Sequence, residues 1–128
     1  MSSQYRKTTE SYWNSLWSNE RTLPEPFSHN GLRASSAYRK GIHAFFCKIF
    51  SKTEPEYRNL LEVGCARSQF LPYFAIEHSL SVTGLDYSPP GCEASRHMLK
   101  RAGVDGVIYC ADVFSPPSNI VGHAEIVA

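Results

Sequence analysis

Three acidic residues lie at the ends of short apolar runs that predict buried strands. Glu62 closes the run 59–63, Asp86 follows 81–85, and Asp112 comes shortly after 107–110. In an open parallel sheet, ligands bind outside the carboxyl ends of the strands. We therefore expect the three carboxylates to gather at one edge of a sheet. There they can accept hydrogen bonds from the hydroxyl and amino groups of a ligand.

The turn after the first run consists mostly of small residues and precedes a predicted helix. Such a turn lets backbone N–H groups approach a ligand closely, and the helix N-terminus favours an anion. A dinucleotide would require the pattern G-x-G-x-x-G, which falls here on Gly64, Ala66 and Gln69. Gln69 is too bulky for the close packing of helix against strand. The second class of ligand that uses such a turn is S-adenosylmethionine. It has no pyrophosphate and presents a methionine end, a sulfonium, a ribose and an adenine.

Asp86 follows Gly64 by about 20 residues, the separation at which a carboxylate can bind both ribose hydroxyls. This position indicates a nucleoside without deciding which one, and Tyr87 can pack against its base. Each acidic residue also has a purely structural explanation. Glu62 can cap the following helix, Asp86 can be a turn residue, and Asp112 can form an Asx-turn.

From Leu60 onwards the chain resembles the class I, S-adenosylmethionine-dependent methyltransferases. Their first motif is an acidic residue followed by G-x-G-x-G, and here Ala66 and Ser68 replace two of the glycines. The resemblance implies that Glu62 orients the amino end of the cofactor. It also implies that Asp112 accepts from the adenine amino group, and that the N–H of Val113 binds the ring. The predicted cofactor-binding residues are Glu62, Gly64, Cys65, Ala66, Asp86, Tyr87, Asp112 and Val113.

The elements that must position these residues alternate between strands and helices. Helices predicted at 69–78 and 89–102 separate strands at 59–63, 81–85 and 107–110, and a fourth strand starts at 124–128. Such alternation predicts βαβ units with parallel strands. The fold class is thus α/β, a Rossmann-like methyltransferase sheet truncated after the start of its fourth strand. By the resemblance, that strand lies beside the first.

Two further helices, around 12–17 and at 35–50, precede the first strand. We expect residues 1–58 to form a helical extension or lid, and residues 59–128 to form the incomplete cofactor-binding portion. Trp13, Trp17 and the segment 31–33 resemble the lid of small-molecule members, with the tryptophans packing in the core or the lid. The helices at 35–50, 69–78 and 89–102 would cover one face of the sheet. A bare opposite face predicts association with a second copy or with a complementary C-terminal polypeptide.

Composition suggests a cytoplasmic protein of at most one domain. The chain has 13 basic and 12 acidic side chains, so long-range attraction to nucleic acid or an anionic membrane is not expected. No apolar run approaches the ~20 residues that span a bilayer, and no signal peptide is evident. The four cysteines are widely separated and predict reduced thiols. The five histidines are scattered and predict no pair of metal ligands one helical turn apart, so no metal site is expected.

The function predicted is S-adenosylmethionine-dependent methyl transfer to a small molecule, by a truncated or split chain, with no nucleic acid or membrane partner. One alternative is a module that binds the cofactor or a partner without catalysis. Another is a nicotinamide oxidoreductase domain, which Gln69 and Asp112 disfavour. No catalytic residue can be named, because groups that position the acceptor usually follow the fourth strand in this family.

Overall fold

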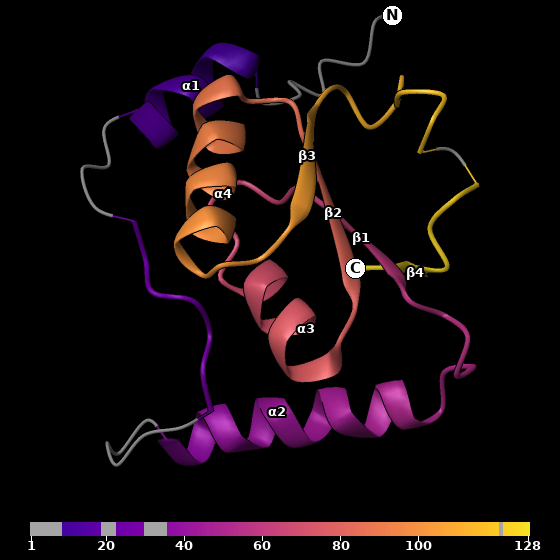
Figure 1. Ribbon diagram of the computed structural model, residues 1–128. Coiled ribbons are helices and arrows are strands. Elements are labelled where there is room, and N and C mark those ends of the chain that lie inside the picture. Colours follow the sequence, from indigo (N-terminus) through magenta and orange to yellow (C-terminus); the bar gives the residue numbers. More distant parts are fainter. Residues whose placement is uncertain (1–8, 19–22, 30–35, 121) are drawn as a thin grey trace, which may run out of the picture.

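The computed structural model describes residues 9–18, 23–29, 36–120 and 122–128, which form a parallel sheet with helices on one side (Figure 1). The strands are β1 (Asn59–Val63), β2 (Ser81–Asp86), β3 (Gly106–Cys110) and β4 (Ile126–Val127), in the order β3-β2-β1-β4. All three pairings are parallel. The predicted α/β class is confirmed, and the fourth strand lies beside the first as expected.

Helices α3 (Phe70–His78) and α4 (Pro89–Arg101) provide the crossovers between the first three strands. Ser88 caps α4, since its Oγ accepts from the Gly91 N–H at 3.5 Å and two prolines occupy the first helical positions. Both helices pack on β2, and α4 also packs on β3. The core between them and the sheet includes Leu60, Leu71, Val82 and Leu99, each at most 3% exposed.

Helix α2 (Ser36–Ser51) packs on α3 instead of covering the sheet directly. It lies crosswise below α3 in Figure 1, and its Phe46 and Phe50 rings lie 5.0 and 5.8 Å from that of Phe74. The expectation that this helix covers the sheet is wrong. The reason is physical, since an apolar stripe shows that a helix face is buried without showing against which element.

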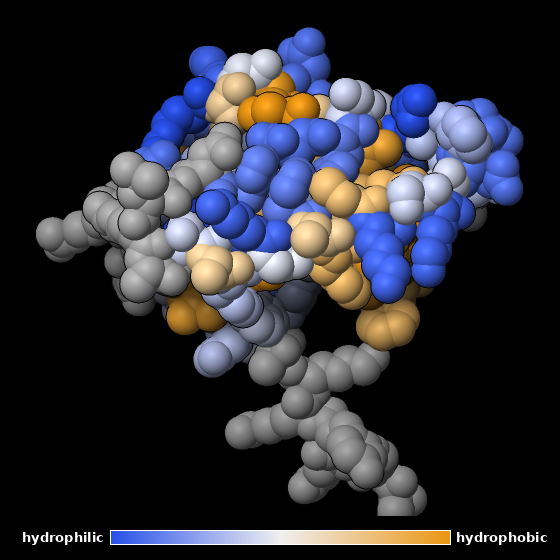
Figure 2. All heavy atoms as spheres, turned by 90° about the horizontal axis from the view of Figure 1, so that it is seen from below, coloured by the Kyte–Doolittle hydropathy of each residue, from blue (hydrophilic) through white to orange (hydrophobic). Residues whose placement is uncertain are grey.

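The outer side of α2 carries exposed apolar side chains such as Phe45 and Ile49. Seen from this end, hydrophilic and hydrophobic residues are intermixed on the surface (Figure 2). After β3 the described chain contains turns and no helix. Among the described helices, none is long and apolar enough to cross a membrane.

Helix α1 (Glu10–Ser18) packs on α4, at the end of the sheet where β1, β2 and β3 terminate (Figure 1). The segment 31–33, expected to belong to a lid, lies outside the described residues. The division into an extension 1–58 and a binding portion 59–128 stays a prediction, as does association through the sheet.

Candidate functional site

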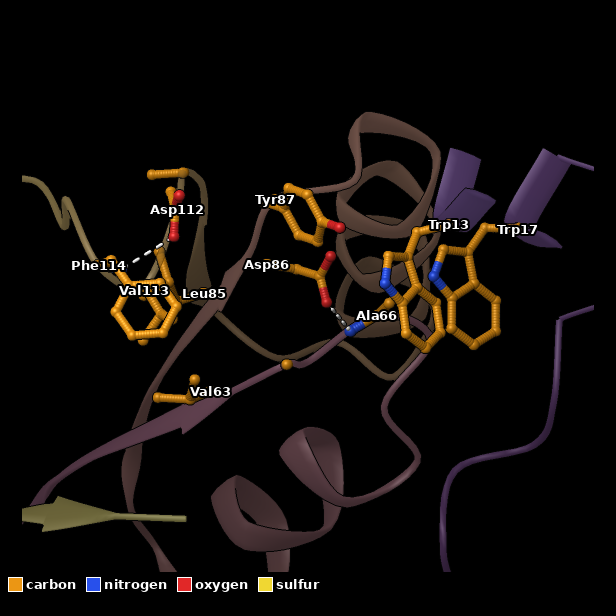
Figure 3. A pocket seen from close by; sticks show the side chains of 12 residues that line it. Trp13, Trp17, Val63, Ala66, Leu85, Asp86, Tyr87, Asp112, Val113 and Phe114 are labelled. Carbon is orange, nitrogen blue, oxygen red and sulfur yellow. Dashed lines mark hydrogen bonds between the residues drawn. The ribbon is translucent and has the colours of Figure 1, made fainter. Parts of the chain in front are cut away.

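A cavity of about 680 Å³ opens at the carboxyl ends of β1, β2 and β3 (Figure 3). Its volume lies within the roughly 300–1,000 Å³ typical of small-molecule and cofactor sites. The cavity lies at the edge of the sheet where the sequence placed the ligand. The residues that line it are Trp13, Trp17, Val63, Gly64, Ala66, Leu85, Asp86, Tyr87, Ala111, Asp112, Val113 and Phe114.

The loop after β1 turns sharply into the cavity wall. Gly64 has φ +76°, a conformation that a residue without Cβ adopts at little cost. The other left-handed residue of the loop is Arg67, with φ +55°. Ala66 and Ser68, which replace glycines of the family motif, do not need the left-handed region. Their substitution therefore leaves the loop unstrained at those two positions.

Two serines hold this loop in place. Ser95 Oγ on α4 donates to the Cys65 carbonyl at 2.7 Å and accepts from the Arg67 N–H at 3.0 Å. Ser68 Oγ accepts from the N–H groups of Phe70 and Leu71 at 3.1 and 3.2 Å, which caps the first turn of α3. Because the loop is anchored to both helices, its shape is set before a ligand arrives.

Glu62 does not line the cavity. Its Oε2 accepts a 2.6 Å hydrogen bond from Ser68 Oγ, so the carboxylate is directed across the loop towards α3. Burial raises the pKa of Glu62, and the Ser68 hydrogen bond opposes that effect. Glu62 thus supports the helix start through Ser68, close to the structural alternative stated above. A role in orienting the cofactor stays a prediction.

Asp86 joins the two loops that flank the cavity. Its Oδ2 accepts from the Ala66 N–H at 3.1 Å and its Oδ1 from the Ser88 N–H at 2.9 Å. A carboxylate offers about four acceptor positions. These two contacts fix its orientation and leave acceptor capacity for a pair of hydroxyls. Figure 3 shows the side chain between Tyr87 and Ala66.

Asp112 and Val113 lie on the opposite wall, after β3. Asp112 Oδ1 accepts from the Phe114 N–H at 2.9 Å, which is the Asx-turn that the sequence also allowed. This turn presents Asp112, Val113 and Phe114 to the cavity together. The Phe114 ring is 78% exposed, so an aromatic surface borders the opening.

Cys65 was predicted to bind the cofactor, and its side chain instead lies in the core. It is 0% exposed, and a Cβ at Gly84 would lie only 2.6 Å from its Sγ. Burial is the main cause that raises the pKa of this thiol to about 12, with the charge of Asp86 adding to it. The small size of the pair Cys65 and Gly84 allows close packing of loop and strand. The thiol therefore contributes packing and does not line the cavity.

Trp13 and Trp17 line the cavity, which the sequence did not predict. Their rings are stacked with centroids 6.0 Å apart, and Arg67 lies 5.9 Å from the Trp17 centroid. Helix α1 reaches this position because Ser88 Oγ donates to Asn14 Oδ1 at 2.9 Å. A Cβ at Gly91 would lie 3.1 Å from Trp17 Cδ1, so glycine gives the indole room against α4.

Curated relatives were found by sequence similarity, whereas no family model matches the chain. The ribosomal RNA small subunit methyltransferase C of Citrobacter koseri is 33% identical over 112 residues, covering 83% of this chain and 30% of the relative. The protein of the same name from Escherichia coli is 34% identical over 98 residues, covering 74% and 25%. The chain thus spans about 30% or less of the length of these relatives.

Solved structures, among them a methyltransferase, share the fold. The geranyl diphosphate C-methyltransferase of Streptomyces coelicolor, in complex with S-adenosyl-L-homocysteine, has a TM-score of 0.55 at 12% identity, covering 88% of this chain and 49% of the other. A structure concerned with conversion of a disulfide into a thioacetal during echinomycin biosynthesis gives 0.57 at 17%, covering 85% and 42%.

The chain is similar to class I methyltransferases in both sequence and fold.

One expectation from the sequence is wrong. The sequence predicted a small-molecule methyl acceptor and no nucleic acid partner, whereas the relatives are named for ribosomal RNA. The physical reason is that net charge reports long-range attraction only. RNA is also recognised through stacking of, and hydrogen bonds to, unpaired bases, which need no large positive charge.

Proposed function

We propose that this methyltransferase chain binds S-adenosylmethionine in the cavity and contributes to methyl transfer onto ribosomal RNA. The observation that supports cofactor binding is the meeting of three strand ends at one cavity. The loop residues Gly64 and Ala66, the carboxylate of Asp86 and the turn at Asp112 all line it. The loop, the carboxylate and the turn lie at the ends of β1, β2 and β3 respectively. A nucleoside cofactor with several functional groups needs such contacts from more than one strand end.

The proposed placement follows from the chemistry of each wall. The ribose hydroxyls donate to Asp86, whose orientation is fixed by Ala66 and Ser88. The adenine lies between Tyr87 and the Asp112–Val113 turn, and the methionine end lies at Gly64 and Ala66. The Trp13 and Trp17 rings suit the positively charged sulfonium, because aromatic faces attract cations.

Ribosomal RNA is the proposed acceptor because the curated relatives carry that name. The two solved structures described above are 17% and 12% identical and support the fold alone. The exposed Phe114 ring at the cavity opening offers a surface on which an unpaired base can stack. A purely cofactor-binding module is less favoured, since the relatives are named as methyltransferases. Methyl transfer itself requires chiefly alignment of acceptor and methyl group.

Calorimetric titration of S-adenosylmethionine into the 128-residue chain tests the cofactor site. We expect saturable binding, a loss of at least about tenfold in affinity for Asp86→Ala, and no change for Asp105→Ala, an exposed carboxylate outside the cavity. One bidentate charge-assisted contact corresponds to roughly 1.5–3 kcal/mol. Circular dichroism checks that Asp86→Ala remains folded.

Two results would contradict the cofactor assignment. One is a folded chain that does not bind S-adenosylmethionine, and the other is tighter binding of NAD, which would restore the oxidoreductase alternative.

The acceptor is tested by transfer of labelled methyl groups to unmodified small-subunit ribosomal RNA. Incorporation above that of Asp86→Ala supports RNA as acceptor, whereas equal labelling of large-subunit RNA contradicts the assignment to the small subunit.

A further inference from the structure

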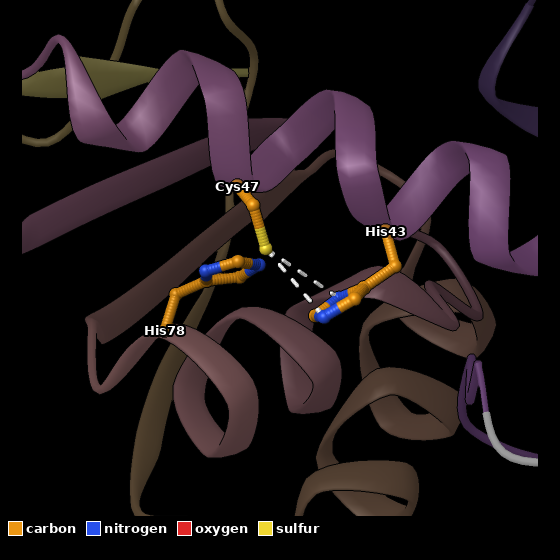
Figure 4. A group of neighbouring side chains, drawn as sticks. All are labelled: His43, Cys47 and His78. Carbon is orange, nitrogen blue, oxygen red and sulfur yellow. Dashed lines mark hydrogen bonds between the residues drawn. The ribbon is translucent and has the colours of Figure 1, made fainter.

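A second group of reactive side chains lies away from the cavity, between α2 and α3. His43 and Cys47 project from α2 towards His78 at the end of α3 (Figure 4). One donor atom from each residue lies within 4.8 Å of the other two. Two imidazoles and a thiol are the ligand types that zinc prefers in proteins.

The spacing within α2 places two of these side chains on one helix face. His43 and Cys47 are four residues apart, about one turn of an α-helix. The expectation that no histidine has a ligand partner one turn away is wrong for this pair. Cys47 Sγ lies 3.5 Å from His43 Nε2. In tetrahedral zinc sites, bond lengths of about 2.3 Å to sulfur and 2.0–2.1 Å to nitrogen separate the two ligand atoms by about 3.5 Å. The pair is therefore already spaced as zinc requires.

Tyr73 orients the two imidazoles. Its hydroxyl lies 2.8 Å from His43 Nδ1 and 2.9 Å from His78 Nε2. The hydroxyl oxygen has two lone pairs, so it can accept the Nδ1–H of His43 and the Nε2–H of His78 together. Each ring then has a lone pair on its other nitrogen, which in His43 is Nε2, the nitrogen nearer to Cys47 Sγ. Metal-bound histidines are commonly oriented by such a hydrogen bond on the second nitrogen.

We propose that His43, Cys47 and His78 bind a zinc ion that links α2 to α3. Three protein ligands leave a fourth position for water. Cys47 is exposed, so the ion can enter from solvent. Binding requires the thiolate, so the proton of the Cys47 thiol passes to solvent as the sulfur–zinc bond forms.

A neighbouring pair supports this site without replacing it. The His29 ring stacks on that of His43 with centroids 3.7 Å apart, and its Nε2 lies 3.3 Å from Glu77 Oε2. His29, His43 and Glu77 also form a group of donor atoms within 4.8 Å. Since both candidate ligand sets include His43, one nitrogen of this ring can bind an ion in only one of them at a time. The thiolate favours the group with Cys47, and the Glu77 carboxylate adds negative charge beside the cation.

The test is titration of Co²⁺, followed by competition with Zn²⁺, on the tag-free 128-residue chain under reducing conditions. We expect one ion per chain, with the visible bands of tetrahedral cobalt and a thiolate-to-cobalt charge-transfer band. Zinc should displace cobalt and raise the thermal midpoint. Cys47→Ser and His78→Gln should each weaken binding more than about 10-fold, because losing even an outer partner of a ligand typically costs 10–100-fold.

Matched controls and the wild-type spectrum keep the test decisive. Cys110→Ser and His97→Gln remove an exposed thiol and an exposed imidazole outside the cluster, and should leave affinity unchanged. His78→Gln also removes the hydrogen bond to Tyr73, so a weaker affinity of this variant could have a structural cause. The cobalt spectrum of the unsubstituted chain tests the site independently of this variant. The proposal is overturned if the charge-transfer band is absent, or if Cys47→Ser binds as tightly as the parent. It is also overturned if binding depends on His29 and not on His78.

Discussion

Single side chains set the shape of the loop after β1, and two of them differ from the family's glycine pattern. Ser68 stands where the pattern has glycine, and its hydroxyl joins Glu62 to the first turn of α3. A glycine at that position could make neither contact. Serine at position 68 has less backbone freedom than glycine, but its side chain caps the first turn of α3. Gly64 still adopts the left-handed conformation that the turn requires.

The buried carboxyl group of Glu62 gives a pH-dependent prediction. Its pKa is raised in the folded chain, chiefly by burial. Its contribution to stability is therefore full below the ordinary pKa of 4.5 and is lost as pH rises through the folded value. Glu62→Gln keeps an acceptor for Ser68 and removes the buried charge. We expect the variant to have a higher urea midpoint than the parent at neutral pH, and the difference to shrink below pH 4.5.

Urea denaturation at about pH 7 and about pH 4 measures this effect, with exposed Glu54→Gln as the matched control. A lower midpoint for Glu62→Gln at neutral pH would mean that the charged hydrogen bond to Ser68 outweighs the cost of burial. The sign of the predicted pH dependence would then be wrong.

The sequence identified the polar groups of the cavity better than its aromatic groups. Asp86, Asp112 and Val113 could be placed because strand ends meet at one edge of a parallel sheet. Trp13 and Trp17 could not, because their position depends on the Asn14–Ser88 hydrogen bond and on the missing side chain of Gly91. The orientation of Cys65 also escaped prediction, since spacing does not show which side chain of a loop turns into the core.

At the level of elements, the docking of α1 on α4 brings the tryptophans to the cavity. Gly91 on α4 allows this approach, because a Cβ there would lie 2.7 Å from the Ala66 Cβ and 3.1 Å from Trp17. Gly91→Ala should displace α1 or the cofactor loop and lower stability by roughly 1–3 kcal/mol, the usual cost of overpacking. Denaturation followed by circular dichroism measures the change.

Gly41→Ala is the matched control for this substitution. Gly41 lies in α2, and a Cβ at this position would have nothing within 4 Å, so alanine should stabilise the helix by roughly 0.5–1 kcal/mol. Equal effects of the two alanines would show that α1 does not pack closely on α4.

Element type was predictable throughout the sheet, whereas element placement was less so. The strands and the helices α3 and α4 lie within about two residues of their predicted bounds, except β4, which is shorter than predicted. Apolar runs and the Ser88-Pro89 start carry that information locally. The packing of α2 against α3 depends on interlocking rings of Phe46, Phe50 and Phe74, which periodicity alone cannot pair.

Across the whole molecule, Glu125 ties the start of β1 to a segment far along the chain. Its Oε2 accepts from the N–H groups of Arg58 and Asn59 at 2.8 and 2.7 Å, just before β4 begins. These bonds lower its pKa, so its contribution is present above the ordinary value of 4.5 and is lost as pH falls through the folded value. We expect Glu125→Ala to loosen β4 at neutral pH, with little effect in acid.

Hydrogen exchange detects this loosening at two amides of the pairing. Val63 N–H donates to Ala128 O at 2.9 Å, and Ala128 N–H donates to Leu61 O at 2.8 Å. Both should exchange faster in Glu125→Ala than in Glu93→Ala, which removes only a surface ion pair with Arg96. Unchanged protection at both amides would show that backbone pairing alone holds β4.

The cavity wall formed by Trp13 and Trp17 also determines the intrinsic tryptophan fluorescence of the protein. The chain contains two tryptophans, and both line the same cavity. Its indole emission therefore originates from one place, so whatever enters or leaves the cavity changes the fluorescence of the entire molecule. The chain carries its own optical reporter of occupancy, with no attached dye and no further indole elsewhere to dilute the signal.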